Sequence, residues 1–390
     1  MMLGIVGKSN TGKSTFFKSA TLIDVEISNR IFTTIKPNIG IGYITAKCPC
    51  KELNLTCNPQ NSKCLNGIRF VPIRLIDIAG LVPDAHNGRG LGNQFLSDIM
   101  EANALIVVID ISGSTDDDGN PVPVGTHDPI KDVEMLEKEL DYWILSLIKK
   151  DWSAAKSQQN SVDLFAKRLS GLGISKNDVK LAMEKLRLAE RIENWSDDEA
   201  LSFVSLLRKQ SKPSIIAANK MDVAPPENLE KMKEAYPEKV ILPASAEIEL
   251  ALREAAKHGL IDYTPGSSSF SVTGIVTEKQ KSALATMEKF LGLHKSTNIQ
   301  KVLDEVVFSS LGMVVVFPVE SESKFSDRKG RVLPDCFLMK KDATALDLAY
   351  QVHEDIGKKF ISAVNAKTKR SVSSDYKLQQ GDIISIKSGR

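Results

Sequence analysis

The chain has no long apolar run, little net charge and few aromatic residues. Its longer apolar stretches, such as 105–111 and 313–319, are too short to cross a bilayer, which excludes a membrane-spanning helix and a membrane partner. The formal net charge is only +2 over 390 residues, which gives no chain-wide nucleic-acid signal. Met1 leads into an apolar run without a basic, cleavable leader, so we expect a cytoplasmic protein.

Cysteine is scarce and unevenly distributed. Four of the five cysteines are spaced C-x-C-x6-C-x6-C, as Cys48, Cys50, Cys57 and Cys64. In a reducing compartment this pattern favours a zinc site over disulfides. The paired C-x2-C spacing of a strong zinc motif is absent, so the alternative of a polar loop whose thiols lie close by chance stays open. Cys336 stands in an apolar context and is expected in the core.

A phosphate-binding loop begins at residue 7, directly after a short apolar run. The pattern G-x-x-x-x-G-K-S predicts nucleotide binding by Gly7, Lys8, Ser9, Asn10, Thr11, Gly12, Lys13 and Ser14, with Thr15 beside them. The glycines let backbone N–H groups close around phosphates at a helix N-terminus. Lys13 is expected to reach the β- and γ-phosphates, and the Ser14 hydroxyl a magnesium ion. The chain is therefore predicted to bind a nucleoside triphosphate.

The base is predicted to be read by Asn219-Lys220-Met221-Asp222, an N-K-x-D motif at the end of an apolar run. The Asp222 carboxylate can accept from guanine N1–H and the exocyclic amine, whereas adenine would leave that charge unpaired. Asn219 is expected to bridge to the neighbouring loop, and the Lys220 stem to pack against the base. One strand later, Ser245-Ala246 fits a loop whose backbone N–H meets guanine O6. GTP is therefore the expected nucleotide.

A third motif, D-x-x-G, is expected to hold magnesium and sense the γ-phosphate. Asp77 follows an apolar run and would bind the metal through water, while Gly80 N–H would contact the phosphate. Upstream, Thr33 and Thr34 lie in a segment where a switch threonine could close on the metal. Of the two, Thr34 is expected to bind it.

Apolar runs that end in polar turns recur along the first 245 residues, which is typical of a mostly parallel α/β sheet. A long helical stretch interrupts them. We expect a G domain over 1–127 and 205–275, with switch regions 30–40 and 77–96 and a cysteine-bearing insert 46–66. A helical insertion over 128–204, a helical connector over 276–311 and a separate α+β domain over 312–390 complete the chain. Within that last domain, 331–334 is expected to be a strand and 344–357 one helix.

The stretches 33–40 and 77–96 resemble the switch regions of the Obg/YchF family of translation-associated GTPases. The second reads D-I-A-G-L-V-x-x-A-x-x-G-x-G-L-G-N-x-F-L. Residues 332–337, 345–349 and 381–384 make the C-terminal part similar to a TGS domain, a ubiquitin-like β-grasp module. The resemblance implies a P-loop NTPase fold with such a domain attached. This chain departs from the YchF pattern at the base-reading motif: YchF proteins carry N-x-x-E and accept ATP, whereas this chain carries N-K-M-D. The difference points to GTP and to an archaeal or eukaryotic-type branch of the family.

The residue after D-x-x-G is Leu81, where Ras-type GTPases place a water-orienting glutamine. Slow hydrolysis, or compensation by other groups, is therefore expected. His86 and Arg89 are candidates, and His86 as an ordinary loop residue stays open. Asn10 resembles the asparagine of cation-activated GTPases, which would allow a potassium ion to act there.

The C-terminal domain carries fourteen Lys/Arg against ten Asp/Glu over 312–390. This excess, with the TGS resemblance, favours RNA or the ribosome as a partner, while a solvated, mildly basic surface stays open. The predicted activity is Mg-dependent hydrolysis of GTP to GDP and phosphate by a translation-linked switch. Two alternatives are a nucleotide-stabilised RNA- or ribosome-binding module with negligible turnover, and an ATPase like other YchF-type proteins.

Overall fold

A computed structural model of the chain describes residues 1–21, 38–78, 80, 98–149, 161–189 and 194–389. The chain forms two compact units. The first comprises Met1–Leu22, Asn38–Gly40 and Arg74–Val302, and the second includes Ile41–Ile73 and Leu303–Arg390. In the part of the chain described, no helix has both the length and the apolar character needed to cross a membrane.

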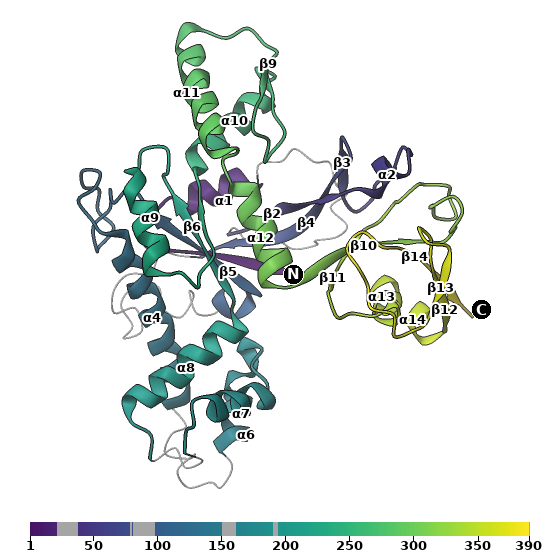
Figure 1. Cartoon of the computed structure of the whole chain (residues 1–390), viewed down its shortest axis with the longest axis horizontal. Helices are drawn as coiled ribbons and strands as arrows, with labels where there is room; N and C mark the ends of the chain where they lie inside the picture. Colours follow the sequence, from purple (N-terminus) through teal and green to yellow (C-terminus); the bar gives the residue numbers. More distant parts are fainter. Residues whose placement is uncertain (22–37, 79, 81–97, 150–160, 190–193, 390) are drawn as a thin grey trace. The chain divides into compact units, whose positions relative to one another are not determined.

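A parallel sheet forms the core of the first unit (Figure 1). Its parallel strands, in the order β4-β1-β5-β6-β7, are β4 (Ile68–Asp77), β1 (Met2–Val6), β5 (Ala104–Asp110), β6 (Ser214–Asn219) and β7 (Ile241–Pro243). Two further strands, β2 (Ile39–Lys47) and β3 (Lys63–Leu65), belong to the same sheet and pair with β4. Every residue of β1 and β5 is buried, as expected for strands covered on both faces. Because the strands are parallel, their carboxyl ends lie along one edge, where α/β proteins bind ligands.

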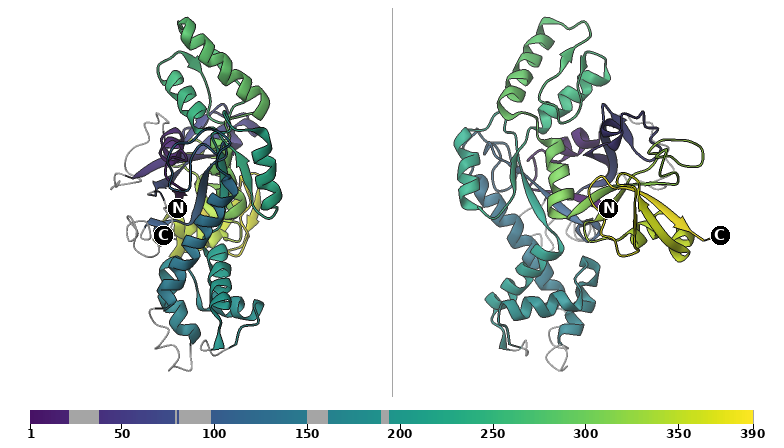
Figure 2. Two further views of the ribbon diagram at one scale, coloured as in Figure 1. Left: turned by 90° about the vertical axis from the view of Figure 1, so that its left-hand side faces the viewer. Right: turned by 45° about the vertical axis from the view of Figure 1, so that its right-hand side comes forward.

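Helices α1 (Lys13–Thr21), α9 (Pro226–Ala235) and α10 (Ala246–Lys257) connect or flank these strands. A helical region follows β5 and comprises α4 (Pro129–Lys149), α6 (Ser161–Leu169), α7 (Lys176–Lys185) and α8 (Asp197–Ser211). Figures 1 and 2 show α6, α7 and α8 grouped near one end of α4, away from α10. Ser175 and Ser196 cap α7 and α8, because each side chain accepts from the N–H three residues on.

The first unit continues through a short hairpin, β8 (Ile261–Asp262) with β9 (Ser271–Val272), into α11 (Glu278–His294) and most of α12 (Ile299–Glu305). Thr277 caps α11 in a capping box with Gln280. Helix α12 passes into a π-helical turn over Val306–Ser310, so the winding of the helix changes near its end.

The second unit contains most of β2 (Ile39–Lys47), the short helix α2 (Pro49–Glu52) and a hairpin of β3 (Lys63–Leu65) with the start of β4. Asn66 and Gly67 join β3 to β4 with φ values of 50° and 82°, which fits a two-residue type I′ turn. A Cβ atom at Gly67 would lie 2.1 Å from Lys51 Cγ, so this position also needs glycine for space.

The C-terminal part of the second unit is a five-stranded sheet with two helices. In the strand order β11-β10-β14-β12-β13, the strands are β11 (Phe337–Lys340), β10 (Met313–Val319), β14 (Ile383–Ser388), β12 (Phe360–Asn365) and β13 (Arg370–Val372). Helices α13 (Ala345–Val352) and α14 (Glu354–Lys358) pack on it, and Leu348 and Ala349 of α13 are buried. This is the β-grasp domain that the sequence predicts.

Two details of the C-terminal domain differ from expectation. The helix expected over 344–357 is broken at His353, which has an extended backbone with φ −166° and ψ 139°. Residues 331–334 form no strand, although Val332 makes an isolated bridge to Ser326. The carbonyls of Val332 and Pro334 accept instead from backbone N–H groups at Asn58 and Gln60. Tertiary contacts therefore use the hydrogen-bonding groups that a strand would have used.

Candidate nucleotide-binding site

The phosphate-binding loop joins β1 to α1 at the carboxyl edge of the sheet. Asn10 and Gly12 have φ values of 61° and 93°, so the backbone turns through the left-handed region twice. A Cβ atom at Gly12 would lie 2.3 Å from Asn219 Nδ2, which requires glycine there. The Thr11 hydroxyl donates to Lys8 O at 3.0 Å and holds the loop closed. The predicted strand–loop–helix context is therefore present.

Lys13 and Gly80 come together beside this loop. Lys13 Nζ donates to Lys8 O at 2.7 Å, and burial lowers the pKa of Lys13 to about 8. A Cβ atom at Gly80 would lie 3.2 Å from Lys13 Nζ and 2.9 Å from Ser9 Oγ. The D-x-x-G glycine thus reaches the phosphate-binding loop, as a γ-phosphate contact would require.

Ser14 and Asp77 form the described part of the expected magnesium site. The Ser14 hydroxyl donates to Asp77 Oδ2 at 2.8 Å. The register of the sheet sets this meeting, because Asp77 at the end of β4 lies opposite Ile5 of β1. Hydroxyl and carboxylate oxygens are ligands that Mg²⁺ prefers, so the two side chains fit the metal.

The expected base-reading residues meet across two neighbouring strand ends. Asn219 Nδ2 donates to Thr11 O at 2.9 Å, and Asn219 Oδ1 accepts from Ala246 N–H at 3.0 Å. The Ser245 hydroxyl donates to Asp222 Oδ1 at 2.6 Å and also accepts from Ile248 N–H as the cap of α10. Asn219 therefore clamps the base loop to the phosphate loop, and Ser245 orients the Asp222 carboxylate.

Lys220 extends along the same edge toward β5. Its Nζ donates to Asp110 Oδ2 at 2.8 Å and to Ser114 Oγ at 3.2 Å. Burial alone would raise the pKa of Asp110, but hydrogen bonds from Lys220, Ser112 and Ser114 lower it below the usual range. Asp110 is not among the residues that the sequence predicts for the site, although its place at the end of an apolar run could have indicated it.

Lys8 belongs to the loop motif, but its side chain points into the protein. Its Nζ is fully buried and lies 2.7 Å from Asp132 Oδ1 and 3.2 Å from Thr115 O. His127 Nε2 also lies 2.7 Å from Asp132 Oδ1. Burial raises the pKa of Asp132, against the lowering effects of Lys8 and His127. Lys8 can therefore contribute only backbone groups to a nucleotide, and no local pattern indicated its partners.

The segment after β5 lies against the phosphate-binding loop. Asn10 Nδ2 donates to Gly119 O at 2.9 Å, and a Cβ atom at Gly119 would lie 2.8 Å from Ser9 Cβ. Asn10 is thus held in place by a main-chain carbonyl, and among the described residues nothing donates to its amide oxygen. Its role toward potassium stays a prediction.

The four clustered cysteines converge in the second unit. Their Sγ atoms all lie within 4.8 Å of one another, and all four are free thiols. A hydrogen bond from Cys64 and the charge of Arg69 lower the pKa of Cys48 to about 4, against the raising effect of burial. The donor set is one that could hold a metal ion.

Several predicted site residues lie outside the described residues. These are the switch threonines Thr33 and Thr34, and the loop residues Leu81, His86 and Arg89. Their roles stay predictions.

Comparison with protein families matches three successive parts of the chain. Residues 2–150 match the 50S ribosome-binding GTPase family, and residues 217–321 match the G4 motif-containing domain of YGR210-like Obg-like GTPases. Residues 325–388 match the TGS domain.

Individual relatives extend the likeness over the whole length. A GTP-binding protein of Methanocaldococcus jannaschii is 46% identical over 390 residues, which cover 99% of this chain and 98% of the relative. The crystal structure of a GTP binding protein from Pyrococcus horikoshii OT3 is 39% identical, with a TM-score of 0.78 over 100% of both chains. The ribosome-binding ATPase YchF of Mycoplasma genitalium is 34% identical over 218 residues, 55% of each chain.

The motifs, the α/β fold and the full-length relatives agree. The chain belongs to the Obg-like GTPases, in the YGR210-like branch, and carries a C-terminal TGS domain.

Proposed function

We propose that this protein is a magnesium-dependent GTPase that hydrolyses GTP to GDP and phosphate and acts as a switch linked to the ribosome. The observation that carries the proposal is the base site. Asp222 accepts from Ser245 Oγ at 2.6 Å, while Asn219 is bonded both to Thr11 of the phosphate loop and to Ala246.

This arrangement favours guanine over adenine. With one carboxylate oxygen held by Ser245, Asp222 is set in a fixed orientation to accept from the two N–H groups on guanine's edge. Adenine lacks both donors there, so the carboxylate would lose water without gaining a partner. The backbone N–H of Ala246 is already used by Asn219, so the contact to guanine O6 proposed for this loop requires a shared or neighbouring N–H.

The residues around the phosphates would supply positive charge and hold the metal. Lys13 would move from the Lys8 carbonyl to the β- and γ-phosphates, and Ser14 and Asp77 would hold magnesium with Thr34. Gly80, beside Lys13, would bond the γ-phosphate and lose that contact on hydrolysis.

Hydrolysis is proposed to be slow without a partner. Leu81 cannot orient a water molecule, so the attacking water needs His86, Arg89 or a cation held near Asn10. A potassium ion there would supply positive charge where it develops in the transition state.

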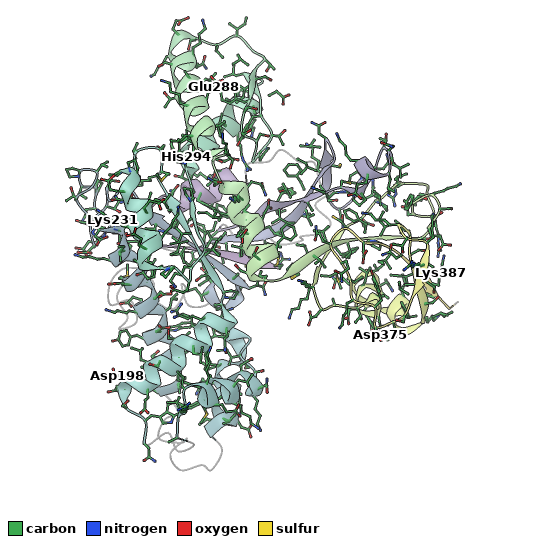
Figure 3. All side chains as sticks on the ribbon, in the orientation of Figure 1. Asp198, Lys231, Glu288, His294, Asp375 and Lys387 are labelled. Carbon is green, nitrogen blue, oxygen red and sulfur yellow. The ribbon has the colours of Figure 1, made fainter. Side chains whose placement is uncertain are left out.

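The ribosome or RNA is the proposed partner of the TGS and helical domains. Support comes from the family match described as ribosome-binding. The surface of the TGS domain is mixed in charge rather than uniformly basic. Lys387 lies 3.5 Å from Glu322, and Asp375 is exposed on the same domain (Figure 3). Shape-specific docking therefore fits this domain better than a purely electrostatic RNA contact.

Two alternatives have specific support. The YchF relative is described as an ATPase, which favours ATP, whereas Asp222 argues against it. Leu81 favours a binding module in which nucleotide stabilises one conformation with negligible turnover.

The decisive experiment measures nucleotide preference of the full chain by competition among GTP, ATP and xanthosine triphosphate, with magnesium, in potassium and in sodium. We expect GTP to be preferred over ATP by at least about 1,000-fold. Asp222→Asn should transfer the preference to xanthosine triphosphate, since an amide donates where xanthine carries a carbonyl. Equal binding of ATP would contradict guanine reading.

Turnover is measured on the same preparations as phosphate release over many cycles, with Lys13→Ala as the inactive control. Release above that control supports a GTPase. Tight GTP binding with phosphate release no faster than in Lys13→Ala would favour the nucleotide-stabilised binding module instead.

A further inference from the structure

Four thiols meet where β2 passes into the β3–β4 hairpin of the second unit. Cys48 precedes α2, Cys50 lies within it, Cys57 is in the following loop and Cys64 is on β3. Cys48 Sγ lies 4.0 Å from Cys57 Sγ, and Cys50 Sγ lies 3.8 Å from Cys64 Sγ. Cys48 and Cys50 are buried, and the other two are partly exposed.

These separations match a tetrahedral metal site. Four sulfurs each about 2.3 Å from a central zinc ion are about 3.8 Å apart. Disulfide bonds would instead bring the sulfurs of each pair to about 2.05 Å. All four thiols approach one another, within 4.8 Å, whereas two disulfides would need only two close pairs.

A second, independent observation is the buried Arg69 beside the cluster. Its side chain is fully buried, and Nη2 donates to Cys48 Sγ at 3.5 Å. Among residues whose placement is described, no carboxylate lies within 4.0 Å of the Arg69 guanidinium, and Asp335 acts on it only at longer range. A guanidinium without a counter-charge is costly to bury. Four thiolates around a divalent cation carry a net charge of about −2, which supplies that counter-charge.

We propose that Cys48, Cys50, Cys57 and Cys64 bind one zinc ion as a structural tetrathiolate whose charge is balanced by Arg69. Four soft thiolates in a tetrahedral set are typical of zinc or iron and exclude magnesium and calcium, which prefer oxygen ligands. Because all four ligands come from the protein, no coordination position is left open for substrate, and the site is structural rather than catalytic.

The metal would organise the surface that docks the TGS domain. The loop 58–61 runs between the ligands Cys57 and Cys64. Asn58 N–H donates to Val332 O at 2.8 Å, and Gln60 N–H donates to Pro334 O at 2.6 Å. The Asn61 side chain pairs with the backbone of Cys336, donating to its carbonyl at 2.8 Å and accepting from its N–H at 3.1 Å. A zinc ion would thus fix both ends of the docking loop.

Arg69 joins the metal site directly to the same segment. Its Nη2 also donates to Leu333 O at 2.9 Å, its Nη1 donates to Ser62 Oγ at 2.9 Å, and its guanidinium lies 5.2 Å from the centre of the Phe317 ring. One side chain therefore contacts a metal ligand, Ser62 next to the docking loop, the segment 332–336 and β10. Loss of the metal should loosen the contact between the loop and 332–336.

The first test is elemental analysis of the full-length chain, purified under reducing conditions without added metal. We expect about one zinc ion per chain in the wild type. Cys57→Ser should lower zinc to below about a fifth of that value, because three thiolates bind more weakly. Cys336→Ser is the matched control, a nearby buried cysteine outside the cluster, and should keep its zinc.

Three further measurements keep the proposal testable if Cys57→Ser does not fold. Wild-type protein loaded with Co²⁺ should show the absorption of a tetrahedral cobalt tetrathiolate. Arg69→Met should weaken zinc binding about 10- to 100-fold, as loss of a partner to a metal ligand does. Chelation should increase hydrogen exchange of 58–61 and 332–336 but not of β5.

The proposal would be overturned by wild-type protein that is metal-free and lighter by four hydrogens, which means two disulfides. Zinc retained in Cys57→Ser, or iron in place of zinc, would also overturn it. Unchanged exchange at 332–336 after chelation would overturn the docking role. None of these readouts depends on nucleotide hydrolysis, so failure here and failure of the proposed GTPase are separable.

Discussion

The nucleotide site of the first unit and the cysteine cluster of the second are built in opposite ways. The nucleotide site draws on strand ends far apart in sequence, and the bond from Asn219 to Thr11 spans 208 residues. The cysteine cluster takes all its ligands from residues 48–64 around one hairpin. A site assembled over long range depends on the whole sheet, whereas a local one depends on its hairpin and on the ion it would bind.

The largest effect is expected from cutting the buried support beneath the phosphate-binding loop. Lys8→Met removes the ammonium that lies 2.7 Å from the buried Asp132 carboxylate and leaves only His127 beside it, so the free energy of unfolding should fall by about 3 kcal/mol. Thermal or urea unfolding measures it. Lys8→Met/Asp132→Asn is the control and should recover at least half of the loss. Equal losses in both variants would show that the ion pair is not what supports the loop.

Next in size is the loss of phosphate contact. Lys13→Ala should weaken GTP binding about 100-fold, because it removes the cation that faces the phosphates. Unlike Lys8→Met, it should leave the unfolding midpoint within a few degrees. Fluorescent-nucleotide titration and thermal unfolding of both variants compare two lysines of one loop. Weakening of less than about fivefold would contradict the predicted role.

The same lysine predicts a pH dependence. Burial lowers the pKa of Lys13 to about 8, below the unfolded value of about 10.4. Folding stability from this group should therefore rise between pH 8 and 10, since the unfolded chain binds the proton more tightly. GTP affinity should fall in that range, by up to about tenfold per pH unit, because binding needs the charged ammonium. Lys13→Ala should make GTP affinity nearly independent of pH in this range. The same pH dependence in wild type and variant would show that Lys13 does not cause it.

A smaller effect is expected at the base loop. Ser245→Ala removes the donor to Asp222 and the cap of α10, so GTP affinity should fall about tenfold while ATP affinity stays unchanged. Competition binding measures the ratio. Thr277→Ala, which removes the cap of α11 away from this site, is the matched control and should not change nucleotide preference. An equal loss for both nucleotides would mean that Ser245 acts only through the helix.

The smallest effect is expected of the cysteine cluster on the nucleotide site. Removing metal from the cysteine cluster should change GTP affinity by less than about twofold, because its ligands and the nucleotide-site residues belong to different units. Nucleotide titration before and after chelation, followed by zinc addition, checks this. A tenfold change reversed by zinc would show that the two sites are coupled.

Much of the site follows from local patterns. The glycines, Lys13 and Ser14 were predictable because the loop's backbone path demands specific residues at fixed spacing, and Gly12 at φ 93° is the clearest case. The α/β class followed from apolar runs ending in polar turns. The expected strand at 331–334 was wrong because its carbonyls bond to Asn58 and Gln60, partners that no local pattern indicates.

The sequence by itself determined the family, the phosphate loop, the guanine-type motif and the β-grasp domain. Only the tertiary structure decided that Lys8 turns inward to Asp132, that Ser245 orients Asp222, and that Arg69 joins the thiols to Leu333. The reason is physical. Periodicity and motif spacing report what the local backbone needs, whereas the direction of a buried charge depends on which distant group the fold places beside it.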